Sequence, residues 1–432
     1  MERSLMQELV GWKDSPRRKP LILNGARQVG KTWLLKRFGS ECFENVAYVS
    51  LDNDALARSY FDPDFDVRRI ISSLSLQLNV DIQPNKTLIV LDEIQSCPKA
   101  ITSLKYFCED ASEYAVAAAG SLLGISANEG TGFPVGKVDT FDLGPMTLLE
   151  FMEATGEGRF VDLVRSGDTI LMNPFKDRIS EILKRYYVVG GMPGVVSVFA
   201  ENGDYREVRI LQSQILADYE RDFAKHVPAR LLPRMMLVWE SIPRHLSQEN
   251  KKFVFGQVRK GARASDFEEV LVWLAQAGLI TKAPRVDKPG LPLSAYTDSK
   301  AFKVFLVDVG LLGAMSGLAP ETVLEGDRVY TEFKGALTEQ YVCQQLVALG
   351  LRVFYWSAEN SSGEIDFLTQ SDGAVYPIEV KAEENLHSKS LRAFAKKYED
   401  MRCRRFSLAG FRDEGWMRNV PLWAIGCADN WL

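Results

Sequence analysis

The stretch that decides the fold is Gly25-Ala26-Arg27-Gln28-Val29-Gly30-Lys31-Thr32. It matches the pattern G-x-x-x-x-G-K-[ST], in which glycines let backbone N–H groups turn toward phosphate oxygens. An apolar segment, Leu21 to Asn24, precedes it and a helical pattern follows it. The alternative, a chance glycine-rich turn before a helix, would have to match all four fixed positions and both flanks. The sequence therefore predicts a phosphate-binding loop.

The chemistry of this loop assigns a role to two of its side chains. Lys31 is expected to reach the β- and γ-phosphates of ATP, and the Thr32 hydroxyl is expected to bind Mg²⁺. A helix that begins near Lys31 adds the positive end of its dipole. We predict that the residues in contact with the nucleotide are Gly25, Ala26, Arg27, Gln28, Val29, Gly30, Lys31, Thr32 and Trp33.

A second acidic motif completes the predicted ATP site. The run Thr87 to Leu91 is apolar after its first residue and leads directly into Asp92 and Glu93. Ligands of parallel sheets bind at the carboxyl ends of the strands, so Asp92 is expected to hold Mg²⁺ and Glu93 to polarise the attacking water. The alternative is a solvated turn. Ser121, after the next apolar run, is a further candidate for contact with the γ-phosphate, with a simple strand-to-loop turn as its alternative.

Composition and charge narrow the class of protein. The 432 residues are 46 % hydrophobic and 25 % charged with a net charge of −5, which is typical of a globular chain and argues against coating nucleic acid by bulk charge. Six cysteines without a C-x-x-C pair favour free thiols. Three histidines without metal-ligand spacing leave catalysis to carboxylates and phosphate chemistry. With no signal peptide or apolar span in evidence, we expect a cytoplasmic protein without a membrane partner.

The order of elements predicts an α/β architecture in four parts. Short β-rich runs alternate with helices up to residue 145, which indicates a parallel sheet covered on both faces. Residues 146–225 have a helical pattern interrupted by the breaker Gly190 to Gly194. Residues 226–325 read as helices followed by a hairpin, which suggests a winged helix. Residues 326–432 read as helix, strand, strand, strand, helix and strand.

The last part carries a second candidate site. Asp366 lies in one strand pattern, and Glu379 and Lys381 share one face of the next, which resembles the PD-(D/E)xK pattern of nucleases. Asp366 and Glu379 would hold Mg²⁺ or Mn²⁺, and Lys381 would position the attacking hydroxide. Glu339, on the apolar face of a predicted helix, could support a metal or orient Lys381. The alternative is a structural ion-pair cluster without catalysis.

Two basic segments depart from the acidic balance of the chain. Residues 226–265 contain eight Lys/Arg against two acids, and residues 388–405 contain seven against two. Lys389, Arg392 and Lys396 fall on one helical face. Both segments adjoin modules of nucleic-acid-binding type, so contact with a DNA or RNA backbone and a merely solvated face are weighed evenly.

Taken together, these residues resemble a prokaryotic family of AAA-type ATPases with a C-terminal domain of formerly unknown function. The motifs that carry the resemblance are GARQVGKT, LDEIQ, AAGS, LGPMTLLEF, VVGGMPGVV and LVDVGLL. The family often has Gly-Arg where this chain has Gly136-Lys137. The resemblance implies a P-loop NTPase core, a helical lid, a winged helix and a restriction-endonuclease-like domain.

Two functions follow from this combination. The first is an ATP-hydrolysing switch or motor that acts on nucleic acid and carries a metal-dependent nuclease domain. The second is an ATP-gated regulatory or scaffolding protein whose nuclease-like domain is inactive. The residues assigned to catalysis are Lys31, Glu93, Asp366, Glu379 and Lys381. Oligomeric state and the identity of any arginine finger stay open.

Overall fold

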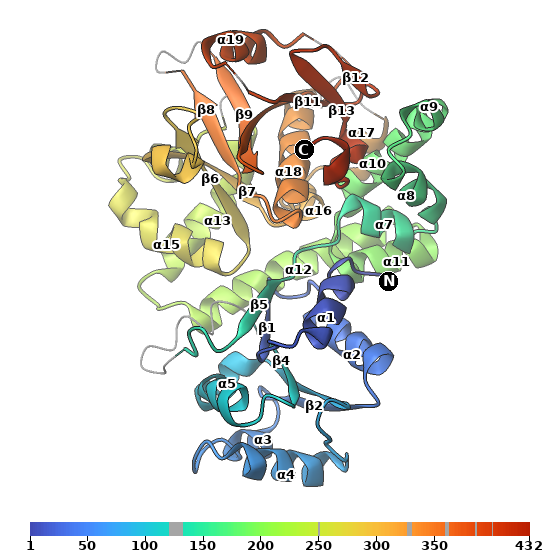
Figure 1. Ribbon diagram of the computed structural model, residues 1–432. Helices are drawn as coiled ribbons and strands as arrows, with labels where there is room; N and C mark the ends of the chain where they lie inside the picture. The colour runs from blue at the N-terminus through green and yellow to red at the C-terminus, as the bar shows by residue number, and fades with distance from the viewer. Residues whose placement is uncertain (121–132, 249–250, 326–330, 359–362, 385–386, 400) are drawn as a thin grey trace. The chain divides into compact units, whose positions relative to one another are not determined.

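The computed structural model divides the chain into two compact units (Figure 1). The N-terminal unit contains residues 2–144 and 276–278, and the C-terminal unit contains residues 1, 145–275 and 279–432. The predicted divisions after residue 145 thus fall within one unit. The structure describes residues 1–120, 133–248, 251–325, 331–358, 363–384, 387–399 and 401–432.

The N-terminal unit is built on a five-stranded sheet in the order β2-β3-β4-β1-β5. All of its strand pairs are parallel. The strands are β1 (Leu21–Asn24), β2 (Asn45–Ser50), β3 (Thr87–Asp92), β4 (Ala115–Ala119) and β5 (Asp139–Asp142). The predicted parallel α/β core is confirmed: β1 coincides with the apolar segment Leu21 to Asn24, and β3 extends the run Thr87 to Leu91 by one residue.

Helices cover both faces of this sheet. They are α1 (Leu5–Asp14), α2 (Lys31–Cys42), α3 (Ala55–Ser59), α4 (Val67–Leu78) and α5 (Pro98–Asp110). Ile89 and Leu91 of β3 belong to the core that contains α4 and α5, whereas Leu88 contacts the α2 side near Gly39. Every residue of β3 is buried, as a parallel strand covered on both sides should be. This burial places the strand's polar end, Asp92, at a fixed point.

The C-terminal unit begins with helices, as the sequence predicted. They are α7 (Leu148–Ala154), α8 (Gly158–Arg165), α9 (Thr169–Met172), α10 (Lys176–Val189), α11 (Pro193–Asn202) and α12 (Tyr205–His226). Thr147 and Glu150 form a reciprocal capping box at the start of α7. The breaker acts as expected, since α10 ends at Val189 and Pro193 begins α11. Across the described ranges, no helix combines the length and apolar character that crossing a membrane requires.

The remaining helices of this unit surround a mixed sheet. They are α13 (Leu232–Leu246), α14 (Phe255–Val258), α15 (Ala264–Gln276), α16 (Val309–Met315), α17 (Pro320–Glu325), α18 (Thr331–Ala348) and α19 (Lys389–Lys397). The strands are β6 (Ile280–Val286), β7 (Thr297–Leu306), β8 (Phe354–Ser357), β9 (Glu364–Ser371), β10 (Ala374–Val380), β11 (Cys403–Ser407), β12 (Arg412–Asp413) and β13 (Met417–Pro421). Their order is β12-β13-β11-β10-β9-β8-β6-β7.

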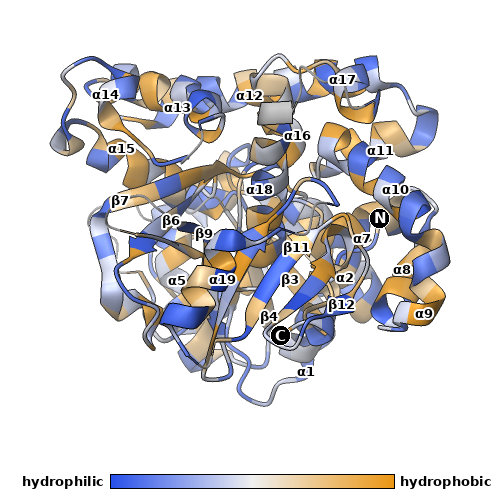
Figure 2. Ribbon diagram, turned by 90° about the horizontal axis from the view of Figure 1, so that it is seen from above, coloured by the Kyte–Doolittle hydropathy of each residue, from blue (hydrophilic) through white to orange (hydrophobic). Residues whose placement is uncertain are grey.

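This sheet crosses the boundary that the sequence placed at residue 325. The β6–β7 hairpin, which we expected to form the wing of a winged helix, pairs through β6 with β8 of the C-terminal strands. The helix–hairpin order is as expected, but the hairpin and the C-terminal strands share one sheet. Figure 2 shows β7 as a largely orange ribbon interrupted by a blue stretch, and the sequence there is Ala301-Phe302-Lys303-Val304-Phe305. The winged-helix assignment stays a prediction.

Two glycines of the breaker segment give a matched test of the packing in the C-terminal unit. A Cβ on buried Gly191 would lie 2.1 Å from the Met146 carbonyl oxygen, whereas a Cβ on exposed Gly194 meets nothing within 4 Å. Gly191→Ala is expected to lower the free energy of unfolding by about 1–3 kcal/mol through overpacking. Gly194→Ala is expected to change it by less than about 1 kcal/mol, and in the stabilising direction. Urea unfolding of both variants measures this, and equal effects would contradict the packing described.

Candidate functional site

The phosphate-loop motif forms a tight turn between β1 and α2. Gln28 and Gly30 have φ of 66° and 93°, so the loop passes twice through the left-handed region before α2 begins at Lys31. Gly25 is required for close approach, because a Cβ there would lie 2.2 Å from the carbonyl oxygen of Leu143. The backbone N–H groups of such a loop and of a helix start are suited to anions.

Lys31 lies inside this loop. Its ammonium donates to the carbonyl oxygens of Gly25 and Ala26, both at 2.9 Å. The residue is only 8 % exposed. Burial lowers the pKa of Lys31 to about 8, against the opposing effect of the Glu93 and Asp92 carboxylates. The sequence thus keeps a desolvated cation beside backbone groups that bind phosphate.

Thr32 and Asp92, the two residues predicted to hold Mg²⁺, are in contact. The Thr32 hydroxyl donates to Asp92 Oδ2 at 2.7 Å, and the Tyr48 hydroxyl donates to the same oxygen at 2.9 Å. Burial, together with the hydrogen bond to Asp92, raises the pKa of Tyr48 to about 12, so this hydroxyl stays a donor. Glu93 follows in a left-handed conformation, with φ of 51°, and accepts a hydrogen bond from the Gln95 side chain.

Other predicted residues of this site have different outcomes. Trp33 lies in the first turn of α2 and is 44 % exposed, and its ring centroid is 5.3 Å from the Arg37 guanidinium. Ser121 lies outside the described residues. Lys137, which stands where the family often has arginine, pairs with Glu109 at 2.9 Å. The side-chain hydrogen bond to Glu109 raises the pKa of Lys137.

Sequence reasoning missed Arg3, which braces the loop from the N-terminal end of the chain. Its guanidinium donates to the carbonyl oxygens of Val29, at 2.8 Å, and Gly144, at 2.6 Å. Arg3 is 7 % exposed. A contact across 141 residues leaves no local pattern, and Arg3 stands before α1, outside every motif in the sequence.

A buried node in the C-terminal unit accounts for two further motifs. Asp308, from LVDVGLL, accepts hydrogen bonds from the Gly191 N–H at 2.6 Å and from the Leu311 N–H at 2.9 Å. Gln344 of α18 donates to the same carboxylate at 3.2 Å. The Gly191 carbonyl in turn accepts from the Met146 N–H at 2.7 Å, and the Tyr186 hydroxyl donates to the Met146 carbonyl. The node therefore fixes Met146, two residues after the N-terminal unit ends.

Glu339, one of the predicted C-terminal site residues, pairs with two lysines. Lys251 donates to Glu339 Oε1 at 2.6 Å, and the fully buried Lys303 lies 3.6 Å from Glu339 Oε2. Lys303 also pairs with Glu364. Glu339 therefore neutralises two lysines, whereas we expected it to support a metal or orient Lys381. Neither Lys251 nor Lys303 was among the predicted site residues, although Lys303 stands alone in an apolar strand.

The paired carboxylates of the nuclease-like pattern lie beside this cluster. The register that pairs Ile378 with Phe367 brings Glu379 next to Asp366. Asp366 accepts a hydrogen bond from the Val380 N–H at 2.7 Å, and Glu379 pairs with Lys381 at 2.7 Å. Within the described residues, no group of three or more His, Cys, Asp or Glu side chains is arranged to hold a metal ion.

Burial dominates the electrostatics of this cluster. It raises the pKa of Asp366 to about 7, and the nearby Glu339 charge adds to the shift. Burial alone would lower the pKa of Lys303, but three surrounding carboxylates outweigh it and the pKa lies above its usual range. The pKa of Glu339 is lowered because its two lysine partners outweigh its burial. The cluster is therefore held together by buried charge pairs.

Some cations of the two basic segments are buried, and only the others lie on the surface. Lys251 pairs with Glu339, and Arg405 is fully buried, with its Nε donating to Asn419 at 2.8 Å, so neither is available to a partner. Helix α15, the second helix of the expected winged helix, exposes Glu268 and Glu269. The cations that remain exposed are Arg230, Arg244, Lys252, Arg259, Lys260 and Arg263 in the first segment and Lys389, Arg392, Lys396 and Lys397 on α19.

Comparisons with known families agree with the geometry of the N-terminal unit. Residues 17–152 match the family model described as an AAA domain, which spans the phosphate loop and all five parallel strands. This match supports an AAA-type ATPase. Residues 180–322 and 334–418 match two domains of unknown function, DUF8612 and DUF4143. Among curated proteins, no sequence match was found.

Several solved structures are similar to part of the chain. The Walker-type ATPase of Pyrococcus abyssi is 14 % identical, covers 73 % of this chain and 95 % of its own, and gives a TM-score of 0.45. Aeropyrum pernix ORC1, solved with DNA, is 14 % identical over 73 % and 93 %, with a TM-score of 0.29. Thermotoga maritima RuvB is 15 % identical over 66 % and 90 %, with a TM-score of 0.30. The assignment rests on the family match.

Proposed function

We propose that this protein is an ATP-hydrolysing switch whose N-terminal unit binds ATP with Mg²⁺ at the phosphate loop. The observation that carries the proposal is the convergence of three groups at the carboxyl edge of the parallel sheet. They are the Lys31 ammonium inside the loop, the Thr32 hydroxyl and the Asp92 carboxylate, the last two joined at 2.7 Å. These are the groups that phosphoryl-transfer sites of this class require.

The donor set fits Mg²⁺. Thr32 and Asp92 present hard oxygens, the kind that Mg²⁺ prefers, and Tyr48 holds the Asp92 carboxylate in place. Mg²⁺ would neutralise the phosphate charge when bound. Lys31 would move its hydrogen bonds from the loop carbonyls to the phosphates, and Glu93 would orient the attacking water. Ser121 remains a proposed contact to the γ-phosphate.

The switch needs a route from the loop to the rest of the chain, and residues 143–146 supply one. The Leu143 carbonyl packs against Gly25, and Arg3 ties the Gly144 carbonyl to Val29 of the loop. Two residues later, Met146 is held by Gly191 and Tyr186 of the C-terminal unit. Because so short a segment is fixed at both ends, a change in the loop on ATP binding is expected to displace the node around Asp308.

Two substitutions separate ATP binding from hydrolysis. Lys31→Met is expected to weaken ATP binding by about 100-fold or more, because hydrogen bonds to charged groups are each worth about 1.5–3 kcal/mol. Glu93→Gln is expected to leave ATP binding intact and to slow hydrolysis by about 10²–10⁴-fold, the usual range for a general base. Calorimetric titration with ATP and Mg²⁺, and a phosphate-release assay, measure the two quantities.

The same lysine variant carries its own control for folding. The pKa of Lys31 is lower in the folded protein, at about 8, than in the unfolded chain, so burying the ammonium penalises folding; this penalty is complete below pH 8 and is lost as the pH rises through the unfolded pKa. Methionine removes that penalty, and the unfolding midpoint at pH 7 is expected to be unchanged or higher. Undiminished ATP binding by Lys31→Met, or full turnover by Glu93→Gln, would contradict the assigned roles.

For the C-terminal unit, we propose that the switch acts through nucleic acid and that the nuclease-like cluster is catalytically silent. The exposed cations of α19 support contact with a nucleic-acid backbone. The pairing of Glu339 with two lysines supports the absence of nuclease activity. The Glu339 carboxylate lies 2.6 Å from the Lys251 ammonium, and a carboxylate whose charge is already neutralised is a poor metal ligand. As arranged, the cluster does not fit Mg²⁺ or Mn²⁺. Metal-dependent cleavage by Asp366, Glu379 and Lys381 stays a prediction to be tested.

One comparison distinguishes an active from a silent cluster. With no nucleotide present, the wild type and Asp366→Asn are expected to bind Mn²⁺ equally weakly, because Asp366 does not hold the metal. The wild type is also expected to show no cleavage of single- or double-stranded DNA or RNA with Mg²⁺ or Mn²⁺. Calorimetric titration with Mn²⁺ and gel assays of end-labelled substrates measure this. Cleavage that is present in the wild type and absent in Asp366→Asn would establish the nuclease instead.

A further inference from the structure

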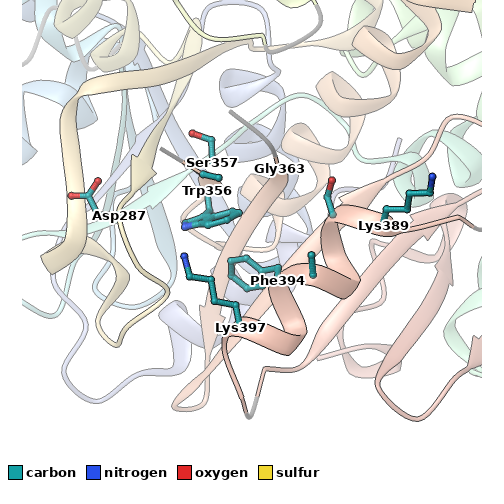
Figure 3. A pocket seen from close by; sticks show the side chains of 10 residues that line it. Asp287, Trp356, Ser357, Gly363, Lys389, Phe394 and Lys397 are labelled. Atoms are coloured by element: carbon teal, nitrogen blue, oxygen red, sulfur yellow. The ribbon is translucent and has the colours of Figure 1, made fainter. Parts of the chain in front are cut away.

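A cavity in the C-terminal unit, distinct from both clusters, lies between the ends of β8 and β9 and helix α19. It encloses about 760 Å³, a size typical of ligand pockets. Its floor is aromatic: the rings of Trp356 and Phe394 lie 4.9 Å apart at 73°, and these residues are 7 % and 1 % exposed. Figure 3 shows the two rings side by side, with Asp287 on the opposite side of the cavity from α19.

The rim of the cavity is polar and basic. Lys389 and Lys397 line it from α19 and are exposed, against a single acid, Asp287. The Lys397 ammonium lies 5.6 Å from the Trp356 ring centroid and points toward it in Figure 3. Ser390 adds a hydroxyl group from α19. An apolar floor with hydrogen-bonding walls and a cationic rim suits a ligand that joins a flat ring to a phosphate.

The place of the cavity in the sheet relates it to the nuclease-like cluster. Ser357, in its wall, pairs with Glu364, and Trp356 pairs with Ile365. Successive strand residues point to opposite faces, so Trp356 and Ile365 face α19 while Glu364 and Asp366 face away from it. The cavity and the cluster thus lie on opposite faces of the sheet, at the same ends of β8 and β9.

We propose that this cavity binds one nucleotide of a single-stranded nucleic acid, with the base over the aromatic floor and the adjoining phosphates at Lys389 and Lys397. The inference rests on the proposed nucleic-acid target and specifies its form. A base held in a duplex cannot enter a cavity of this kind, so the site selects single strands. The exposed cations that continue along α19, Arg392 and Lys396, would follow the backbone outside the cavity.

The test uses two neighbouring lysines as a matched pair. Lys397 lines the cavity and Lys396 does not, although both are exposed residues of α19 with the same charge. Binding of fluorescein-labelled 15-nucleotide single strands to the full chain is followed by anisotropy at fixed salt. Lys397→Ala is expected to weaken binding about tenfold, and Lys396→Ala no more than about twofold. Ala393→Trp, which fills the cavity and keeps every charge, is expected to weaken binding as much as Lys397→Ala.

Probe chemistry completes the design. An abasic strand of the same length and a duplex are each expected to bind about tenfold more weakly than the single strand, because neither offers a free base. Equal losses for Lys396→Ala and Lys397→Ala, with Ala393→Trp unaffected, would overturn the cavity while leaving nucleic-acid binding in place. No binding of any nucleic acid by the wild type would overturn the proposed target itself. Tighter binding of an acidic, tyrosine-rich peptide, lost in Ala393→Trp, would assign the cavity to a protein partner instead.

Discussion

The constraint on which this structure turns is that residues 143–146 are held at both ends by buried contacts. At one end the Leu143 carbonyl occupies the space that a side chain on Gly25 would need, and Arg3 joins Gly144 to the phosphate loop. At the other end Met146 is bonded to Gly191. Four residues span little more than about 10 Å even when extended, so these two sets of contacts lie close together along the chain.

The node at the far end explains why glycine and aspartate occur where they do. Gly190 lies against Asp308, with the oxygen only 2.2 Å from the place of a Cβ, and Gly191 donates to the same carboxylate. Burial raises the pKa of Asp308, and the hydrogen bonds it accepts oppose that shift. Through Gln344 the node reaches α18, the helix that also carries Glu339. One helix thus contributes to both the node and the lysine-paired cluster.

Local patterns pointed to side chains that the fold brings together at the proposed ATP site, whereas the long-range pairings left no local pattern. Lys31, Thr32 and Asp92 were predictable because a loop, a helix start and a strand end are each encoded within a few residues. Parallel strands then bring the polar ends to one edge. The partners of Glu339 come from 88 and 36 residues upstream, and no periodicity connects them. The same holds for Arg405, which belonged to a basic run in the sequence but is buried against Asn419. A run of charged residues in the sequence does not show which of them are exposed, because tertiary packing decides their burial.

We expect ATP bound at the phosphate loop to alter the C-terminal unit through residues 143–146. Backbone hydrogen–deuterium exchange, with and without ATP and Mg²⁺, tests it most directly. Altered exchange is expected at residues 25–32 and also at residues 186–192 and 308–311, and neither change is expected in Lys31→Met. Altered exchange confined to residues 2–144 would contradict the claim.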